Sequence, residues 1–131
     1  MDTIYLILNT RDELLRIDFS TIVYFEAEGN YTHIILRNRT KHTLCLNLAR
    51  MQQVLSEHLQ SRATIFARVG KRHIINLSYV HLISLSRQCL ILSDGSTFAF
   101  TLAVSKEALK ALRQLYVKTF GDSSAAHDAN T

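Results

Sequence analysis

The chain has 131 residues and no proline, and 47% of its residues are apolar, which fits a single domain with a buried core and leaves little room for two. It carries 15 Lys and Arg against 11 Asp and Glu, and two of the acids lie in the last eleven residues, so the charge excess of residues 1–120 suits a polyanionic partner. No apolar run is long enough to span a bilayer, and the N-terminus lacks the cationic, apolar and small-residue pattern of a signal peptide, so we expect a cytoplasmic protein without a membrane segment.

Most of the chain has the period-two pattern of short strands bounded by polar turn residues. The first two runs flank 9–12 and predict an N-terminal hairpin. The runs in chain order are 3–8, 13–18, 21–28, 31–37, 41–47, 80–86, 89–93 and 96–102. Together with the stretch around 66–76, they predict a mainly β domain of about eight to ten antiparallel strands.

Two segments have helical spacing instead. From Asn47, a plausible N-cap, an apolar stripe through Leu48, Met51, Val54, Leu55 and Leu59 predicts one short helix between strands. A second helix is predicted from Ser105 to Phe120, with Gly121 beyond its end. The tail 121–131 is polar and poor in core residues, so we expect it to be disordered.

The stretch "ARVGKRHIINLSYV" places three cations directly before the apolar pair Ile74–Ile75. A solvated charge run does not usually lead straight into a buried strand. We expect Ile75 to be buried, and the pair to anchor a cationic loop.

The sequence offers no specific catalytic arrangement. Gly29–Asn30 lies between two strands and is read as a turn, since no phosphate-binding glycine motif is present. His42 and Cys45 are three apart on a strand and point to opposite faces, which makes them a poor metal pair. Cys45 and Cys89 are predicted to be small core residues. We therefore predict no enzyme, no metal, no cofactor and no small-molecule substrate.

The order of "IVYFEAEGNYTHIIL", a short helix, "FARVGKRHIINLSYVHLI", "SDGS" and "TFAFT" resembles the LytTR DNA-binding domain family, the AlgR/AgrA/LytR type of bacterial transcription regulators. The resemblance covers about residues 4–118, and "EAEGNY" with "F-x-R-V…I-x-N" is its most specific part. It implies an elongated stack of small antiparallel sheets whose loops, rather than a recognition helix, enter the grooves of DNA. It also implies one DNA-binding domain over residues 1–120.

The resemblance also implies three DNA-contacting segments. The family usually reads "RVHRS" where this chain reads "RVGKR", so its basic base-reading position falls on Lys71. The family contact in the first loop aligns with Thr32, or with His33 if the register moves by one. In the third segment Leu102 stands where an arginine is expected; it could face a groove or pack under the C-terminal helix. The predicted contacts are Asn30, Tyr31, Thr32, His33, Arg68, Gly70, Lys71, Arg72, Thr101, Leu102 and Lys106.

We predict a transcription regulator that reads the major grooves of promoter DNA, bound as two copies on direct repeats. The alternative is a module of the same fold that acts through protein contacts, an idea motivated by the missing arginine. The position of the basic groups separates the two. A shared face for segments 29–33, 70–72 and 101–106 favours DNA binding, whereas Arg37, Arg39 and Lys41 alone on a different face would mean that the positive charge is merely dispersed. The first predicted strand follows Met1 at once, so we expect no receiver domain before it, in a regulator that stands alone or a fragment of a longer one.

Overall fold

A computed structural model describes residues 3–126 of the chain. In this part, ten strands and two α-helices follow one another in an order that matches the predicted one. The strands are β1 Tyr5–Asn9, β2 Leu14–Asp18, β3 Ile22–Glu28, β4 Tyr31–Leu36, β5 Lys41–Leu44, β6 Phe66–Val69, β7 His73–Asn76, β8 Val80–Ser84, β9 Cys89–Ser93 and β10 Ala99–Ala103. The helices are α1 Leu48–Leu59 and α2 Lys106–Phe120.

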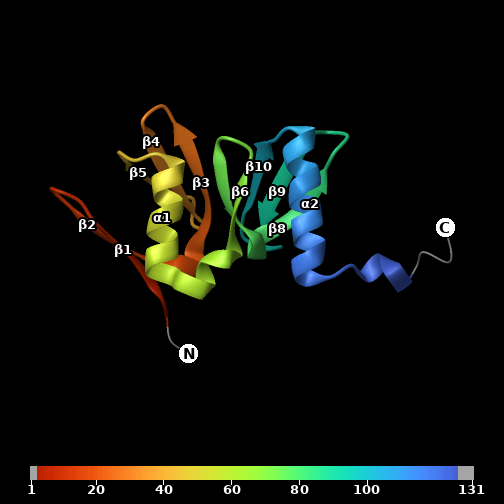
Figure 1. Ribbon diagram of the computed structural model, residues 1–131, viewed down its shortest axis with the longest axis horizontal. Helices are drawn as coiled ribbons and strands as arrows, with labels where there is room; N and C mark the ends of the chain where they lie inside the picture. The colour runs from red at the N-terminus through yellow and green to blue at the C-terminus, as the bar shows by residue number, and fades with distance from the viewer. Residues whose placement is uncertain (1–2, 127–131) are drawn as a thin grey trace.

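The strands form three antiparallel sheets, which confirms the predicted mainly β stack. β1 and β2 make a separate hairpin, the central sheet has the order β5-β4-β3-β7-β6, and the third sheet has the order β10-β9-β8. Figure 1 shows these layers side by side along the longest axis of the molecule, with the hairpin projecting at one end, α1 over the central sheet and α2 near the other end. Within the described residues, most neighbouring strands are consecutive in the chain, and the exception is β3 beside β7 in the central sheet.

The central sheet is buried on both faces, and this explains the apolar pair after the basic stretch. One core joins it to the hairpin and α1 and includes Phe25, Ile34 and Ile74. The other joins it to the third sheet and α2 and includes Tyr24, Ile35 and Ile75. Successive side chains of a strand point to opposite faces. Ile74 and Ile75 therefore enter different cores, and all four residues of β7 are buried.

Both predicted helix caps are present. The Asn47 side chain accepts a hydrogen bond from the Arg50 amide at 2.8 Å, and the Ser105 hydroxyl accepts one from the Ala108 amide at 3.3 Å. Each bond satisfies an amide that the first turn of a helix would otherwise leave without a partner. α2 ends at Gly121, as predicted.

Two expectations from the sequence have different outcomes. The prediction that both cysteines are core residues is wrong, because Cys45 is exposed just after β5 and Cys89 is half-buried. The tail that we expected to be disordered begins with a short 3-10 turn over Ser123–Ala126, and the rest of it, residues 127–131, lies outside the described residues. No helix within residues 3–126 is long and apolar enough to cross a membrane.

Candidate nucleic-acid interface

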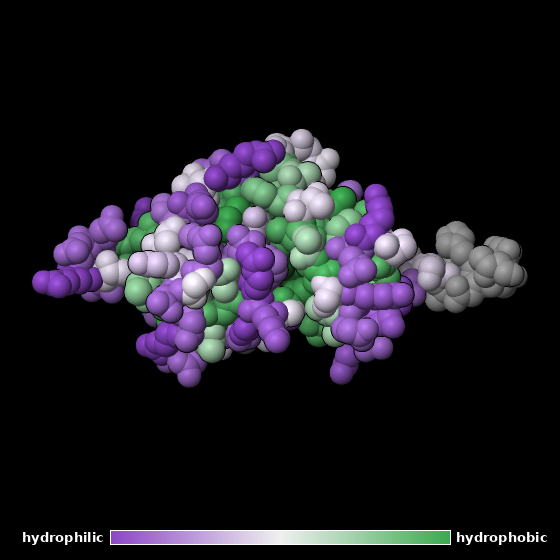
Figure 2. Space-filling view, turned by 90° about the horizontal axis from the view of Figure 1, so that it is seen from above, coloured by the Kyte–Doolittle hydropathy of each residue, from purple (hydrophilic) through white to green (hydrophobic). Residues whose placement is uncertain are grey.

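Several connections gather at one end of the molecule, which we call the loop end. They are the β3–β4 turn, the β6–β7 loop, the β8–β9 turn and the junction between β10 and α2. Figure 1 shows the β3–β4 turn, the β6–β7 loop and the N-terminus of α2 at its upper edge. Figure 2, which looks onto this end from above, shows hydrophilic groups separated by apolar atoms. The loop end thus combines polar side chains from the central sheet with those of the third sheet and α2, which lie far apart in the sequence.

The loop between β6 and β7 is the most basic of these connections. Val69 pairs with His73, so Gly70, Lys71 and Arg72 form a three-residue hairpin loop. The Lys71 and Arg72 side chains are exposed, the latter to 67%. Two cations therefore stand at the tip of a hairpin whose base is buried.

The backbone of this basic loop is held from two sides. Nη2 of Arg68 donates to the Lys71 carbonyl at 3.1 Å, while its Nη1 donates to Gln52 of α1, also at 3.1 Å. On the other side, the amide of Ala27 in β3 donates to the Arg72 carbonyl at 2.8 Å. Because both carbonyls are engaged, the loop is fixed before it meets a partner.

Gly70 brings the basic loop close to α2. Its φ of +63° lies in the left-handed region that favours glycine, and a Cβ built on it would lie 3.8 Å from the Cβ of Ala108. A shallow depression is lined by this loop together with Ala103, Val104 and Ser105. The basic loop and the β10–α2 junction are therefore neighbours at the loop end.

A row of carboxylates and imidazoles crosses the central sheet beneath the basic loop. Glu26 of β3 is the strand partner of both His33 in β4 and His73 in β7. Its Oε2 accepts from Nε2 of the buried His73 at 3.0 Å and lies 4.0 Å from Nη2 of Arg72. Burial raises the pKa of the Tyr24 hydroxyl, and the charge of Glu26 raises it further.

A second carboxylate–imidazole pair, Glu28 and His33, lies beside Glu26 and His73 on the same face of the sheet. Oε1 of Glu28 is 2.7 Å from Nε2 of His33, and Nδ1 of His33 is 2.8 Å from the Thr43 hydroxyl. The hydrogen bond from His33 and the charge of that imidazole hold the pKa of the Glu28 carboxyl below its usual range, with smaller contributions from Lys41 and Arg72. An ionised carboxylate only accepts hydrogen bonds, so Nε2 of His33 carries the proton.

The predicted contact residues divide into exposed and buried ones. The exposed ones are Asn30, Tyr31, Arg68, Gly70, Lys71, Arg72, Thr101 and Lys106. All of them lie at the loop end or on the strand leading to it, although Thr101 sits on the outer face of β10. Arg68 is exposed, but its guanidinium supports the basic loop as described above.

Three predicted contact residues have side chains that the fold encloses. Thr32 is 0% exposed and its hydroxyl donates to the Leu46 carbonyl at 2.6 Å. His33 is buried between Glu28 and Thr43. Leu102 is 6% exposed and lies in the core beneath α2, together with Leu109 of that helix. These burials correct the prediction that the three side chains are offered to DNA, and for Leu102 the inward alternative holds.

Sequence reasoning missed Arg87 and the exposed carboxylate of Glu28. Arg87 lies in the β8–β9 turn, and the Gln88 carbonyl of that turn accepts from the Val104 amide at 3.1 Å, which places the turn beside the β10–α2 junction. The signal was available, because alternate turns of an antiparallel meander fall at the same end of a sheet. Counting turns along the predicted strands would have placed Arg87 at the loop end.

A second basic turn lies at the other end of the central sheet. β4 runs from Tyr31 at the loop end to Leu36, so Arg37 and Arg39 lie one strand length away. They line a depression together with Asp94 and Thr97 of the β9–β10 turn. The Thr97 hydroxyl and the amides of Ser96, Thr97 and Phe98 donate to Asp94 and hold the pKa of that carboxyl well below its usual range. The turn with Arg37 and Arg39 carries two cations away from the loop end, so it can serve as a control for the charge of the basic loop.

The described residues show no metal centre: within residues 3–126, no three His, Cys, Asp or Glu side chains converge in a way that could hold a metal ion. Every buried side-chain nitrogen or oxygen in this part of the chain has a hydrogen-bond partner. The polar groups of the loop end that remain available are therefore those at its surface.

Comparison with known proteins adds two findings. The family model described as the LytTr DNA-binding domain matches residues 12–116. A solved structure, the LytTr DNA-binding domain of a putative methyl-accepting/DNA response regulator from Bacillus cereus, is 21% identical with a TM-score of 0.57, covering 88% of this chain and 97% of that one. At this identity the structural likeness speaks for the fold alone. A search of the curated proteins found no match.

Proposed function

Because the chain belongs to the LytTR DNA-binding domain family, which supports a role in DNA-binding transcription regulation, we propose that its loop end reads the major grooves of promoter DNA. The basic loop would enter one groove, and the β3–β4 turn and the β10–α2 junction would lie against the same duplex. Specificity then comes from base edges, while phosphate contacts set position and orientation.

The single observation that carries this proposal is the backbone support of the basic loop. Its two cations stand at an exposed tip, and the carbonyls of Lys71 and Arg72 are already hydrogen-bonded. A loop that is ordered beforehand loses little further entropy on binding. Arg72 can pair in a bidentate way with a phosphate or a guanine edge, whereas Lys71 acts as a compact charge.

The remaining residues of the loop end take supporting or secondary roles in this proposal. Asn30 and Tyr31 offer an amide and an aromatic ring from the β3–β4 turn. Lys106 and Arg87 are suited to phosphates at the edge of the contact area. Arg68 holds the basic loop in place, and so contributes to affinity through the position of Lys71.

We further propose that two copies bind direct repeats, as the resemblance to the family implies. A selection from random duplexes with the purified protein tests both the sequence preference and the spacing. Enrichment of two similarly oriented half-sites supports the proposal. Enrichment of no motif would leave general DNA affinity as the function.

The double variant Lys71→Ala, Arg72→Ala tests the role of the basic loop. We expect it to bind DNA more weakly, because two phosphate or base-edge contacts are lost. If each cation neutralises one phosphate, the log–log salt slope falls in magnitude by about two. Fluorescence anisotropy with one duplex, repeated across a salt series, measures this slope.

The matched control removes the same charge from the other end of the central sheet. Arg37→Ala, Arg39→Ala lowers the net charge equally, so any general effect of charge appears in both double variants. We expect the control to keep a slope close to that of the unmodified protein. Equal slopes for the two double variants would remove the basic loop from the interface, and no duplex binding by the unmodified protein would favour the protein-contact alternative.

A further inference from the structure

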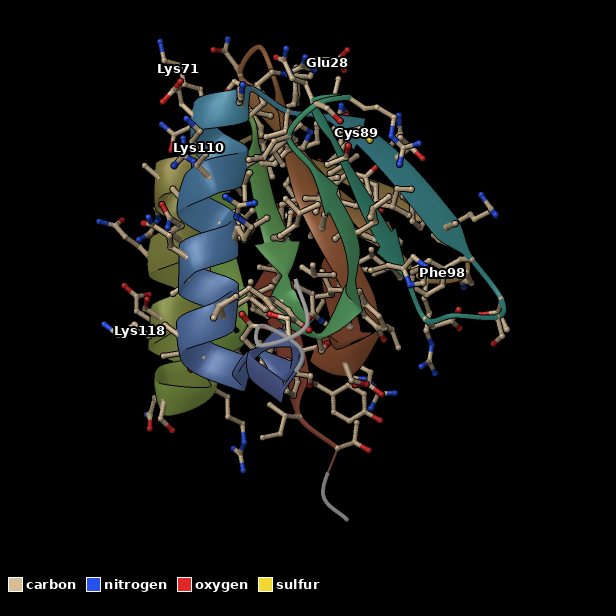
Figure 3. The ribbon with its side chains drawn as sticks, turned by 90° about the vertical axis from the view of Figure 1, so that its right-hand side faces the viewer. Glu28, Lys71, Cys89, Phe98, Lys110 and Lys118 are labelled. Carbon is tan, nitrogen blue, oxygen red and sulfur yellow. The ribbon has the colours of Figure 1, made fainter. Side chains whose placement is uncertain are left out.

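Glu28 is an acidic side chain within a surface that we expect to meet a polyanion. Its side chain is 74% exposed at the end of β3. Figure 3 shows Glu28 and Lys71 at the same end of the molecule. A carboxylate directed at phosphates would be repelled by them, so a residue of this charge weakens general DNA binding at this place.

The structure fixes the orientation of this carboxylate. Oε1 accepts from Nε2 of His33 at 2.7 Å, and His33 is itself held by the Thr43 hydroxyl. The His33 side chain is only 9% exposed, so it is a rigid support. No hydrogen bond to Oε2 of Glu28 is found within residues 3–126, and the side chain is largely exposed, so this oxygen can accept a hydrogen bond from a partner.

The chemistry of the groove edges selects a ligand for that oxygen. An ionised carboxylate can only accept hydrogen bonds. In the major groove, guanine offers acceptors and thymine offers an acceptor and a methyl group, whereas cytosine offers the N4 amine. Adenine has an amine as well, but its N7 acceptor lies beside it and opposes a carboxylate. The exocyclic amine of cytosine is the best match.

We propose that Glu28 is a specificity-determining residue that accepts a hydrogen bond from the exocyclic amine of a cytosine, with His33 as its positioning residue. This inference rests on the proposed function, since it requires a duplex at the loop end. It assigns a base preference to an acidic side chain of the loop end. It also gives the buried His33 a role in readout without direct contact to DNA.

Parallel selections from random duplexes test the inference with the full chain, Glu28→Ala and Glu28→Gln. We expect the unmodified protein to enrich cytosine at one position of the motif, and Glu28→Ala to lose that preference. Glutamine pairs with adenine N6 and N7, so Glu28→Gln should move the preference at that position from cytosine to adenine. In direct titrations, the discrimination at this position should fall roughly tenfold in Glu28→Ala, the effect of about 1.4 kcal/mol.

Glu13→Gln is the matched control, because Glu13 is an exposed carboxylate at the tip of the β1–β2 hairpin. It should leave the motif unchanged. The inference is wrong if Glu28→Ala retains the motif of the unmodified protein, or if it only raises affinity for all duplexes equally. Either result leaves the proposed function standing. Failure of the unmodified protein to bind any duplex contradicts the proposed function itself.

Discussion

Leu102→Arg should destabilise the domain by about 3 kcal/mol or more, because it places a charge in a core that offers no partner for it. Leu102 is 6% exposed and packs with Val104 and Leu109 where β10 leads into α2. For a chain of this length, 1 kcal/mol corresponds to roughly 3 to 5 °C, so the melting temperature should fall by about 10 °C. A thermal melt followed by circular dichroism measures the change.

Thr101→Arg provides the control for that variant. Thr101 precedes Leu102 on the same strand but is exposed, so the same charge should change the stability by no more than about 0.5 kcal/mol. If Leu102→Arg has the same melting temperature as Thr101→Arg, and also gains discrimination between matched and scrambled duplexes, the inward position of Leu102 is wrong. The arginine expected by the family resemblance would then have a place in a groove.

Ile75→Ala should cost about 2 to 5 kcal/mol, the usual range for a large buried aliphatic residue replaced by alanine. Ile75 is 0% exposed and pairs with Tyr24 of β3 and Ala67 of β6, in the middle of the central sheet. Neighbouring strands on both sides restrict relaxation, so the cavity stays open. Chemical denaturation should show a lower midpoint with an unchanged m-value.

Ile7→Ala makes the same chemical change on the outer face of the β1–β2 hairpin, where Ile7 is 37% exposed. Its cost should be about 1 kcal/mol or less. Ile75→Ala should still bind DNA under conditions where it remains folded, since Lys71 and Arg72 are unchanged. A wild-type denaturation midpoint for Ile75→Ala would refute the burial of β7 on both faces.

The fold was largely predictable because its signals are local. Short apolar alternation separated by turns predicted the hairpins, and the 3.6-residue stripe after Asn47 predicted α1. The cap residues Asn47 and Ser105 marked the helix starts correctly. The pairing of β3 with β7 links residues about fifty positions apart, and local periodicity does not predict such a pairing.

The candidate site was less predictable, because alternation does not mark a solvent face on a strand covered from both sides. Four consecutive residues of β4, Thr32 to Ile35, are buried. Two of them are polar and are accepted there because Thr32 bonds to a carbonyl and His33 to Glu28 and Thr43. Burial of such groups depends on partners that the linear sequence does not place.

Leu102 is a different case, because its inward position could be predicted from the sequence. Large apolar residues occupy 98, 100, 102 and 104, while 99, 101 and 103 are small or polar. This alternation places Leu102 with Phe98 and Phe100, whose rings make edge-to-face contacts with Tyr79 and Tyr24, respectively. The sequence-based prediction left both positions of Leu102 open, although this local pattern favours the inward one.

The central claim is that the loop end binds duplex DNA, and amide chemical-shift mapping by NMR tests it most directly. The chain, at 14.9 kDa, is small enough for a complete titration of the isotope-labelled protein with a selected duplex. The account predicts that the largest shifts fall in 29–31, 70–72 and 103–107, with smaller ones in 85–88. Largest shifts in 37–41 or along the exposed face of α2, with the loop end unaffected, would contradict it.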